Sequence, residues 1–515
     1  PARVPGTVQQ DLLAAGIIPD PYFDANETQI QWVGEQDWLY RAQFDLPEGM
    51  RDAPQIDLCC AGLDTFATVW LNGTRLSSSE NMFVPQRVPI TSYARETGNE
   101  LLVQFASPWR EGKAAEQLYG VRTGWNGDAS RMYVRKAPYH YGWDWGPTIL
   151  TIGPWQPITL EAYAARIAEI ACPVQLSEDH AVAQFPVTVH LVLAGGQPID
   201  GWRVEIDLVG PEGEIVASHH LTVDSPVCKH TFHVSQPRLW WPLGHGDQPL
   251  YEIRVRLAKE DAIMDERQLR VGVRRIELVQ APIADQAGTS FYFRVNDAPI
   301  FCQGANWIPA DNFLPQVTPE RYRQWLELAR DAHMNMVRVW GGGIYEQDVF
   351  YDLCDEMGLL IWQDFMFACG MYPAHEHFLA NITAEAEAQI RRLRHHPSVA
   401  LWSGNNEDYL VARKDYQPAI APDVDEAFPA RAIYERRLPE LCARLDPDRP
   451  YWPGSPYTPA EFGDDPNGMT GGDRHTWEIW HGPKLPYQEY ASYGGRFVSE
   501  FGMAALPARA TIDAA

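Results

Sequence analysis

Short runs in which apolar and polar residues alternate fill the first 165 positions, a pattern that predicts β-strands. Strands are predicted at Trp38–Phe44, Ile56–Cys60, Thr65–Leu71, Leu101–Phe105 and Ile149–Tyr163. The pair Asn72-Gly73 after the third strand is typical of a hairpin turn, because both residues tolerate positive φ. Thr7 and Gly16 indicate the two ends of a short helix that precedes the strands. Many short strands separated by turn residues predict a jelly-roll-like β-sandwich over residues 1–165.

The alternation continues through residues 166–280, where it predicts a second all-β unit. Its strands are predicted at Val187–Leu193, Trp202–Leu208, Thr231–Val234, Tyr251–Leu257 and Leu269–Leu278. The length and spacing are typical of an immunoglobulin-like β-sandwich. This stretch contains no recognisable set of catalytic residue types, so we expect it to act as a spacer.

After residue 280 continuous apolar runs alternate with amphipathic segments. The apolar runs predict strands at Ile300–Gly304, Asn335–Trp340, Leu359–Asp364, Ser398–Ser403, Pro450–Gly454, His475–Trp480 and Arg496–Glu500. Helices are predicted at Pro319–His333, Glu346–Met357 and Phe378–His395. Buried strands that alternate with helices predict a parallel sheet closed as a (β/α)₈ TIM barrel over residues 281–515. Only about seven strands precede Ala515, so we expect the barrel to be incomplete at the C-terminus, truncated after about strand 7.

Charge and cysteine content exclude several classes of protein. The formal net charge of −26 argues against nucleic acid or an anionic membrane as a partner, because phosphate groups need a positive surface. No apolar run approaches 18 residues, so no membrane span is predicted. The eight cysteines show no paired spacing, which favours free buried thiols and a soluble protein of a reducing compartment such as the cytoplasm. The first residue is Pro1, so a periplasmic, secreted or lysosomal location stays open. The oligomeric state is not indicated.

Aromatic residues are abundant, with 19 Trp, 22 Tyr and 19 Phe. Flat aromatic rings suit the apolar faces of sugars, although they also fill ordinary cores. The segment Tyr139–Pro147 reads YHYGWDWGP and carries too many large rings and polar groups for a core strand. Two interpretations remain: a structural aromatic cluster between domains, or a wall of a carbohydrate site.

Two glutamates follow predicted barrel strands. Glu407 ends the sequence WSGNNE after the fourth strand, and Glu500 ends RFVSE at the seventh. Side chains at the C-terminal ends of barrel strands perform catalysis in this fold. A pair of carboxyl groups suits glycoside hydrolysis, in which one protonated acid assists the leaving oxygen and one carboxylate attacks. The alternative for each glutamate alone is a solvated residue or a structural ion pair.

These motifs resemble those of a known family. NNE at Asn405–Glu407 and SEFG at Ser499–Gly502 resemble the acid/base and nucleophile motifs of glycoside hydrolase family 2. Further strings resemble its β-mannosidase branch: YHYGWDWGP at Tyr139–Pro147, LWWPLGHGDQPLY at Leu239–Tyr251, GANWIPAD at Gly304–Asp311, VRVWGGG at Val337–Gly343 and WQDFMFAC at Trp362–Cys369. The resemblance covers essentially the whole chain.

The resemblance implies a retaining exo-β-mannosidase that acts on β-mannosides and manno-oligosaccharides without a cofactor. Glu500 would form a covalent glycosyl-enzyme, and Glu407 would act as acid and then as base. The resemblance also places several residues in substrate binding: Trp143, Asp144 and Trp145 around the terminal sugar, Asn406 at its 2-hydroxyl, and Arg338 beside the nucleophile. Arg338 has a simpler alternative as an ordinary ion pair at a barrel end. Trp307, Trp340, Asp364, His475, Trp477 and Trp480 are candidate pocket residues, with core packing as the alternative for each.

Other functions stay open at this point. Another family 2 exo-β-glycosidase, such as a β-galactosidase, β-glucuronidase or exo-β-glucosaminidase, would keep the fold and change the sugar. A carbohydrate-binding protein without catalysis is a second alternative, but the presence of both Glu407 and Glu500 argues against it. The segment His375-Glu376-His377 lacks the spacing of a zinc motif, so no metal site is predicted.

Overall fold

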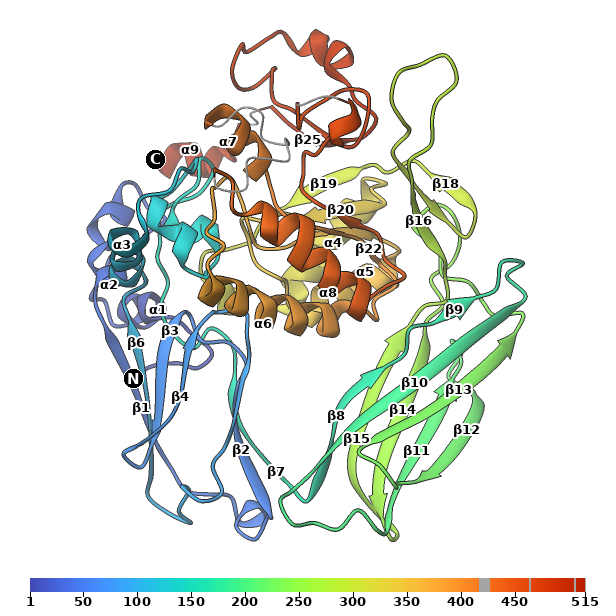
Figure 1. Cartoon of the computed structure of the whole chain (residues 1–515). Helices are drawn as coiled ribbons and strands as arrows, with labels where there is room; N and C mark the ends of the chain where they lie inside the picture. Colours follow the sequence, from blue (N-terminus) through green and yellow to red (C-terminus); the bar gives the residue numbers. More distant parts are fainter. Residues whose placement is uncertain (416–426, 463–464, 504–505, 515) are drawn as a thin grey trace.

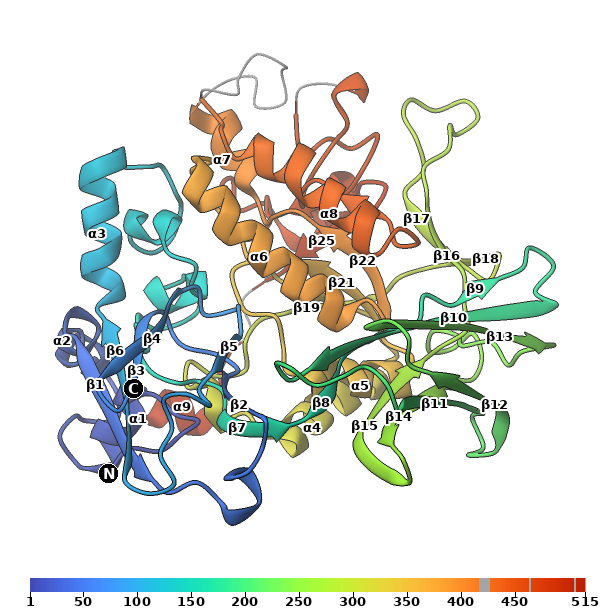
Figure 2. The same cartoon turned by 60° about the horizontal axis from the view of Figure 1, so that its bottom comes forward.

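The computed structural model describes residues 1–515 except 416–426, 463–464, 504–505 and 515. Two β-sandwiches, one blue and one green in Figure 1, lie beside each other and both pack against a unit of alternating strands and helices. Figure 2 shows the same arrangement from another side, with the helices of this third unit covering its strands. The boundaries at residues 165 and 280 remain predictions.

The first sandwich contains two antiparallel sheets with strand orders β1-β6-β3-β4 and β5-β2-β7. Its strands are β1 Trp38–Phe44, β2 Gln55–Cys60, β3 Phe66–Leu71, β4 Thr74–Glu80, β5 Gln86–Pro89, β6 Asn99–Ala106 and β7 Ile158–Tyr163. Its helices are α1 Val8–Ala14, α2 Trp32–Glu35 and α3 Pro108–Tyr119. Thr7 caps α1, and Asn72 and Gly73 adopt positive φ in the β3–β4 turn. The predicted strand Ile149–Tyr163 is wrong in its first half, where Pro154 and Pro157 cannot donate to a ladder.

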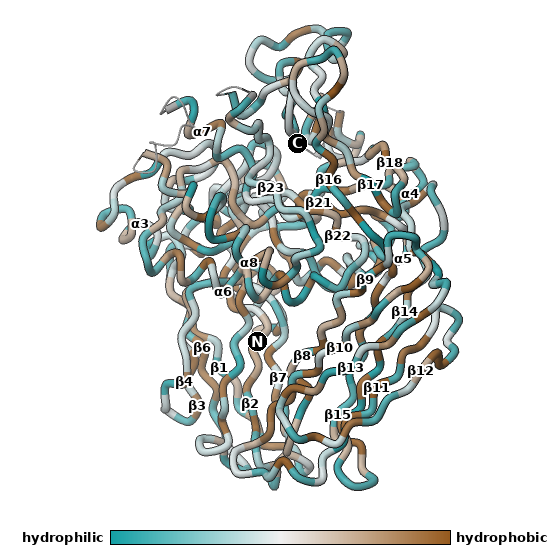
Figure 3. The backbone as a smooth tube through the Cα atoms, turned by 45° about the vertical axis from the view of Figure 1, so that its right-hand side comes forward, coloured by the Kyte–Doolittle hydropathy of each residue, from teal (hydrophilic) through white to brown (hydrophobic). Residues whose placement is uncertain are grey.

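The second sandwich contains sheets with orders β13-β10-β8 and β12-β11-β14-β15, and β9 pairs with β10. Its strands are β8 Ala165–Ala171, β9 Gln175–Leu176, β10 Val182–Leu193, β11 Trp202–Val209, β12 Ile215–Thr222, β13 Val227–Ser235, β14 Tyr251–Lys259 and β15 Ala262–Val271. Apolar and polar positions alternate along these strands, as Figure 3 shows, and the apolar side chains form the core between the sheets. The predicted strand Leu269–Leu278 is two strands, because the chain leaves β15 and begins β16 (Ile276–Val279) in a separate sheet with β17 (Tyr292–Val295) and β18 (Ala298–Ile300).

The third unit contains seven strands of an incomplete (β/α) barrel within the described residues. These are β19 Gly304–Trp307, β20 Met336–Val339, β21 Leu360–Asp364, β22 Val399–Ser403, β23 Tyr451–Trp452, β24 Arg474–Thr476 and β25 Val498–Phe501. The strands β19 to β23 form one parallel sheet in chain order, and β24 pairs in parallel with β25. The helices are α4 Pro319–Asp331, α5 Asp348–Met357, α6 Glu376–Leu393, α7 Asp408–Asp415, α8 Leu438–Leu445 and α9 Arg509–Ala514.

The first barrel strand was predicted at Ile300–Gly304, and this placement is wrong. The strand begins at Gly304, where the predicted one ends. The side chain of Asn335 explains the difference, because it accepts a hydrogen bond from the Gln303 backbone and donates one to the Phe301 carbonyl. These backbone groups are therefore bonded to a side chain instead of a strand ladder.

Short helical turns connect the main elements. The 3₁₀ turns are η1 Asn26–Gln29, η2 Glu48–Met50, η3 Ala129–Tyr133, η4 Pro138–Tyr141, η5 Leu314–Gln316, η7 Ala460–Phe462 and η8 Tyr487–Tyr493, and η6 Ile433–Arg437 is a π-helical turn. In the described part of the chain no helix has the length and apolarity to cross a membrane. All eight cysteines there are free.

A buried ion pair fixes the first sandwich to the barrel. Arg135 donates to both carboxylate oxygens of Glu385 on α6, at 2.6 and 2.8 Å. Asn81 of the sandwich and Tyr345 of the barrel donate to the same carboxylate. A buried charge needs such a complete set of partners. The pair therefore holds the two units in one relative position.

Candidate active site

A cleft of about 1560 Å³ opens at the C-terminal ends of the barrel strands and also reaches residues that precede the strands, such as Phe301 and Met334. The predicted residues that line it are Trp143, Asp144, Trp145, Arg338, Trp340, Asn406, Glu407, His475, Trp477, Trp480 and Glu500. These residues come from the first sandwich and from four barrel strands (β20, β22, β24 and β25) or the loops that follow them. The fold thus gathers in one place side chains that are up to 357 positions apart, from Trp143 to Glu500.

Trp307 was predicted as a pocket residue, but its ring lies in the core behind the cleft. It packs against Tyr322 and Phe350, and its indole N–H donates to Glu346 at 2.9 Å. Successive side chains of a strand point to opposite faces. Asn306, the preceding residue, is the one that points into the barrel, where it accepts from Arg338 at 3.0 Å.

Glu407 follows β22 and has few hydrogen-bond donors. Its backbone adopts a left-handed conformation with φ of 63°. His475 Nδ1 lies 2.7 Å from its Oε1, and the Cys369 thiol donates to its Oε2 at 3.2 Å. Burial raises the pKa of Glu407, and the nearby Asp144 carboxylate raises it further. This environment favours a protonated carboxyl group.

Glu500, on β25, has strong donors instead. Arg338 donates to its Oε1 at 2.5 Å, and the Trp477 indole donates to its Oε2 at 3.1 Å. A guanidinium and an N–H donor both stabilise a carboxylate in its charged form. The two glutamates therefore have different hydrogen-bond donors: Arg338 and Trp477 for Glu500, and the Cys369 thiol for Glu407.

The two carboxyl groups meet at His475. Oxygens of Glu407 and Glu500 and a ring nitrogen of His475 all lie within 4.8 Å of one another. His475 Nδ1 is 2.7 Å from Glu407 Oε1 and 3.4 Å from Glu500 Oε2. Burial lowers the pKa of His475 to about 4, so the ring is neutral near pH 7.

Arg338 organises the floor of the cleft. Besides Glu500, it donates to Asp364 Oδ2 at 2.6 Å and to the Asn406 side-chain oxygen at 2.8 Å. Burial raises the pKa of Asp364 to about 6, although the Arg338 cation lowers it. Because Arg338 occupies the Asn406 oxygen, the Asn406 amide nitrogen is the group left to face a ligand or Cys369, whose Sγ is 3.4 Å away.

The aromatic segment of the first sandwich reaches over the cleft. The Trp143 ring packs edge-on against Trp340, with ring centres 4.7 Å apart, and Trp145 contacts the same ring at 5.6 Å. Asp144 is half-exposed and lies 4.0 Å from His481 of the barrel. The Tyr139 backbone N–H donates to the Gly342 carbonyl at 2.9 Å and so fixes the start of this segment to the barrel.

Arg131 and Cys369 are further residues of the site that sequence reasoning missed. Arg131 is buried between the sandwich and the barrel, and its guanidinium donates to the carbonyls of Ala368 and Cys369 at 2.8 and 3.1 Å while it lies 5.2 Å from the Trp143 ring centre. Cys369 contacts Glu407 as described above. The end of the WQDFMFAC string after β21 is a strand end and could have indicated Cys369, whereas no local pattern distinguishes Arg131.

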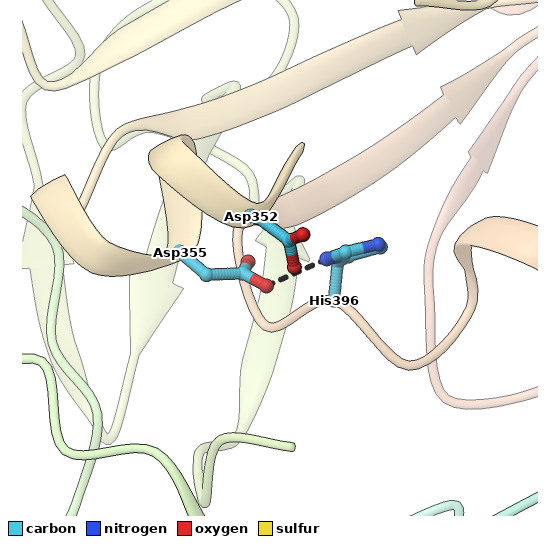
Figure 4. Close-up of side chains that lie close together, drawn as sticks. All are labelled: Asp352, Asp355 and His396. Carbon is cyan, nitrogen blue, oxygen red and sulfur yellow. Dashed lines mark hydrogen bonds and ion pairs between the residues drawn. The ribbon is translucent and has the colours of Figure 1, made fainter. Parts of the chain in front are cut away.

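A second group of two acids and one histidine lies elsewhere in the barrel. Asp352 and Asp355 on α5 face His396, as Figure 4 shows. Asp355 bonds His396 Nδ1 at 2.6 Å and accepts from the Ser398 backbone at 3.0 Å. Asp352 pairs with Arg270 of the second sandwich at 2.7 Å. The charged groups of this cluster are thus occupied by partners within the protein.

Comparisons with known proteins agree with this architecture. Residues 1–156 match the family model described as glycosyl hydrolase 2 galactose-binding domain-like, and residues 165–274 match glycosyl hydrolases family 2. A β-mannosidase B from Thermothelomyces thermophilus is 45% identical over 530 residues, covering 100% of this chain and 60% of that protein. A β-mannosidase B from Emericella nidulans is 43% identical, covering 99% and 60%.

Solved structures give a similar result. The crystal structure of a β-D-mannosidase from Dictyoglomus thermophilum superposes with a TM-score of 0.91 at 39% identity, covering 99% of this chain and 62% of that one. An exo-chitosanase from Amycolatopsis orientalis has a TM-score of 0.65 at 18% identity, covering 88% and 49%, which shows a shared fold alone. The chain spans about 60% of the length of the curated relatives it matches.

Proposed function

Since the chain belongs to glycoside hydrolase family 2, we propose that its cleft hydrolyses terminal, non-reducing β-D-mannosides with retention of configuration. Glu407 serves as the acid/base and Glu500 as the nucleophile. The relatives described above as β-mannosidases support mannose as the sugar.

One observation carries this proposal: a carboxyl oxygen of Glu407 and one of Glu500 lie within 4.8 Å of each other, and the two carboxyl groups accept hydrogen bonds from different donors. Retaining enzymes place their carboxyl groups roughly 5–5.5 Å apart, whereas inverting enzymes need about 6.5–9.5 Å to admit a water molecule. Arg338 and Trp477 donate to Glu500, as suits a nucleophilic carboxylate, and the raised pKa of Glu407 suits a proton donor.

The reaction follows from these two roles. The carboxylate of Glu500 attacks the anomeric carbon while the bond to the leaving oxygen breaks and Glu407 gives that oxygen its proton. A covalent ester between mannose and Glu500 results. Water then attacks the same carbon, its proton passes to Glu407, and the bond to Glu500 breaks.

Recognition of the terminal sugar falls to the groups around the two glutamates. In this proposal Asn406 contacts the 2-hydroxyl and Asp144 accepts hydrogen bonds from sugar hydroxyls. Trp143 and Trp340 supply ring faces and edges for the apolar side of the sugar. The exposed Trp145 and the partly buried Trp477 extend this wall toward the cleft mouth.

A panel of aryl glycosides tests the proposal. We expect the 4-nitrophenyl β-mannoside to be hydrolysed with a kcat/KM well above those of the β-galactoside, β-glucuronide and β-glucosaminide. The released mannose should first appear as the β-anomer in an NMR time course. Faster turnover of another sugar would overturn the choice of mannose, and initial release of the α-anomer would overturn retention.

A further inference from the structure

A row of buried polar side chains leads away from Glu407, beginning at His475 in the cleft wall. Glu407 Oε1 lies 2.7 Å from His475 Nδ1, and His475 Nε2 lies 3.0 Å from Ser455 Oγ. Ser455 Oγ in turn lies 2.7 Å from Asp473 Oδ2. His475, Ser455 and Asp473 are all at most 1% exposed, so solvent does not replace these contacts.

Asp473 is surrounded by donors. The Trp452 indole and the Tyr457 backbone donate to its Oδ1 at 2.8 and 3.0 Å, and both can only donate. The Ser455 and Ser499 hydroxyls approach Oδ2 at 2.7 and 2.5 Å. Asp473 thus acts as an acceptor at both oxygens.

This arrangement fixes the proton on Ser455. A serine hydroxyl has one proton, and the carboxylate oxygen at 2.7 Å is the nearest and strongest acceptor within its reach. The Ser455 oxygen therefore presents a lone pair to His475 Nε2, which must carry the ring proton to make a hydrogen bond. Because burial keeps the pKa of His475 near 4, the ring holds only one proton, and Nδ1 is a bare acceptor.

A bare Nδ1 at 2.7 Å from Glu407 Oε1 needs a proton between the two atoms. We propose that Asp473 and Ser455 are positioning residues that hold His475 in its Nε2–H tautomer, and that this tautomer keeps the acid proton on Glu407. The inference rests on the proposed function in one respect: there the Glu407 proton is the one given to the leaving oxygen. Other charged or titratable groups that face Glu407 or His475 are Glu500, Arg338, Asp144, His481, Cys369 and Arg474.

The test is Asp473→Asn, which keeps the shape of the side chain but replaces one acceptor oxygen by an NH₂ donor. If the amide oxygen still accepts from Trp452 and Tyr457, the NH₂ group donates to Ser455 Oγ. The serine proton is then free to donate to His475 Nε2. The ring proton then moves to Nδ1 and donates to Glu407, which stabilises the Glu407 carboxylate. Glu407 should therefore lose its proton at lower pH than in the unmodified protein.

Two substrates separate positioning from general damage. Mannobiose has a poor leaving group that needs a proton, whereas 2,4-dinitrophenyl β-mannoside does not. On the basic side of the pH profile, we expect Asp473→Asn to lower kcat/KM for mannobiose on the order of 10-fold and for the dinitrophenyl substrate by less than about twofold. Equal losses on both substrates, or an unmoved pH profile, would overturn the proposal.

Asp446→Asn is the matched control. Asp446 also accepts from the indole of a barrel-strand tryptophan, Trp402 at 2.9 Å, but it does not contact His475 or Glu407. This variant should leave the ratio of the two kcat/KM values unchanged. A ratio changed as strongly as in Asp473→Asn would show that loosening of the barrel suffices and would contradict the assigned role.

A second variant and a direct titration keep the proposal testable if Asp473→Asn does not fold. Ser455→Ala removes the hydroxyl that selects the tautomer, so the profile should move in the same direction by a smaller amount. The protonation of Glu407 can be followed by NMR of ¹³C-labelled glutamate, with its signal assigned by its loss in Glu407→Gln. If the Glu407 titration is the same in both variants as in the unmodified protein, the positioning role of Asp473 and Ser455 is overturned. This readout needs no turnover, so an inactive unmodified protein would refute the proposed function separately.

Discussion

Two clusters in the barrel have the same composition, two carboxyl groups and one histidine within 4.8 Å, but different surroundings. In the cluster of Asp352, Asp355 and His396, the charged groups are bonded to one another, to the Ser398 backbone or to Arg270. In the cluster of Glu407, His475 and Glu500, both carboxyl groups border an open cleft.

The difference shows what distinguishes a reactive site from a structural brace. His396 lies three residues before the start of β22 at Val399, so the first cluster lies at the N-terminal end of the barrel strands, where side chains stabilise this fold. The second lies at the C-terminal end, where strand ends face substrate. Residue type alone therefore does not identify a site. The position along the strand and an open cleft beside the carboxyl groups do.

The largest expected effect comes from Glu500→Gln. The amide cannot form the glycosyl ester, so kcat for 4-nitrophenyl β-mannoside should fall by roughly 10⁴-fold or more. The melting temperature should change by only a few degrees, because an amide oxygen can still accept from Arg338 or Trp477. Substantial activity in a folded variant would contradict the claim that the cluster of Glu407, His475 and Glu500 is catalytic and differs in this from the other cluster.

Glu407→Gln should have a smaller effect that depends on the leaving group. For mannobiose we expect kcat/KM to fall by about 10²–10⁴-fold, whereas the dinitrophenyl substrate should lose far less. In the unmodified protein, the raised pKa of Glu407 keeps the acid protonated to higher pH, so kcat/KM for mannobiose should fall only as pH rises through that pKa. A steady rise of activity with pH would contradict the acid role.

Asp355→Asn tests the structural cluster. The amide nitrogen would face either the Ser398 backbone N–H, which it would leave unpaired, or His396 Nδ1, which would then have to accept the hydrogen bond. The free energy of unfolding should fall by about 1–3 kcal/mol, measured by urea denaturation. At a temperature where the variant is folded, its kcat/KM should stay within about twofold of that of the unmodified protein. A catalytic loss comparable to that of Glu407→Gln would refute a purely structural role for the cluster.

Arg270→Gln should have the smallest effect. Arg270 joins the second sandwich to Asp352 and Glu356 of α5, but all three side chains are partly exposed. Such pairs contribute about 0.2–1 kcal/mol, and less at high salt. The melting temperature of the variant should therefore be slightly below that of the unmodified protein in low salt, and the two should be equal in high salt. A large loss in high salt would require another role for Arg270.

The sequence predicts regular periodic elements well and contacts between distant segments poorly. β1, α4 and α6 follow directly from periodicity and capping residues, and the first barrel strand is misplaced because the distant Asn335 side chain replaces its ladder. In the site, Glu407 and Glu500 are recognisable from their strand-end motifs. Their roles and the sugar remain proposals.

The partners that set the two environments are harder to predict. Arg131 and Asp473 act through carbonyls and hydroxyls of segments far away in sequence, and neither lies in a motif with a defined chemistry. Trp307 is assigned to the wrong face because a four-residue strand in a string rich in polar and aromatic residues gives no clear alternation.

The most direct test of the account is to trap the covalent intermediate. A 2-deoxy-2-fluoro-β-mannosyl fluoride should react with the protein, because fluorine at carbon 2 slows both steps while the fluoride leaving group permits the first. The account predicts an intact-mass increase of one fluoromannosyl group, located by peptide mass spectrometry on Glu500. Labelling of Glu407 or another residue, or time-dependent inactivation without any adduct, would contradict it.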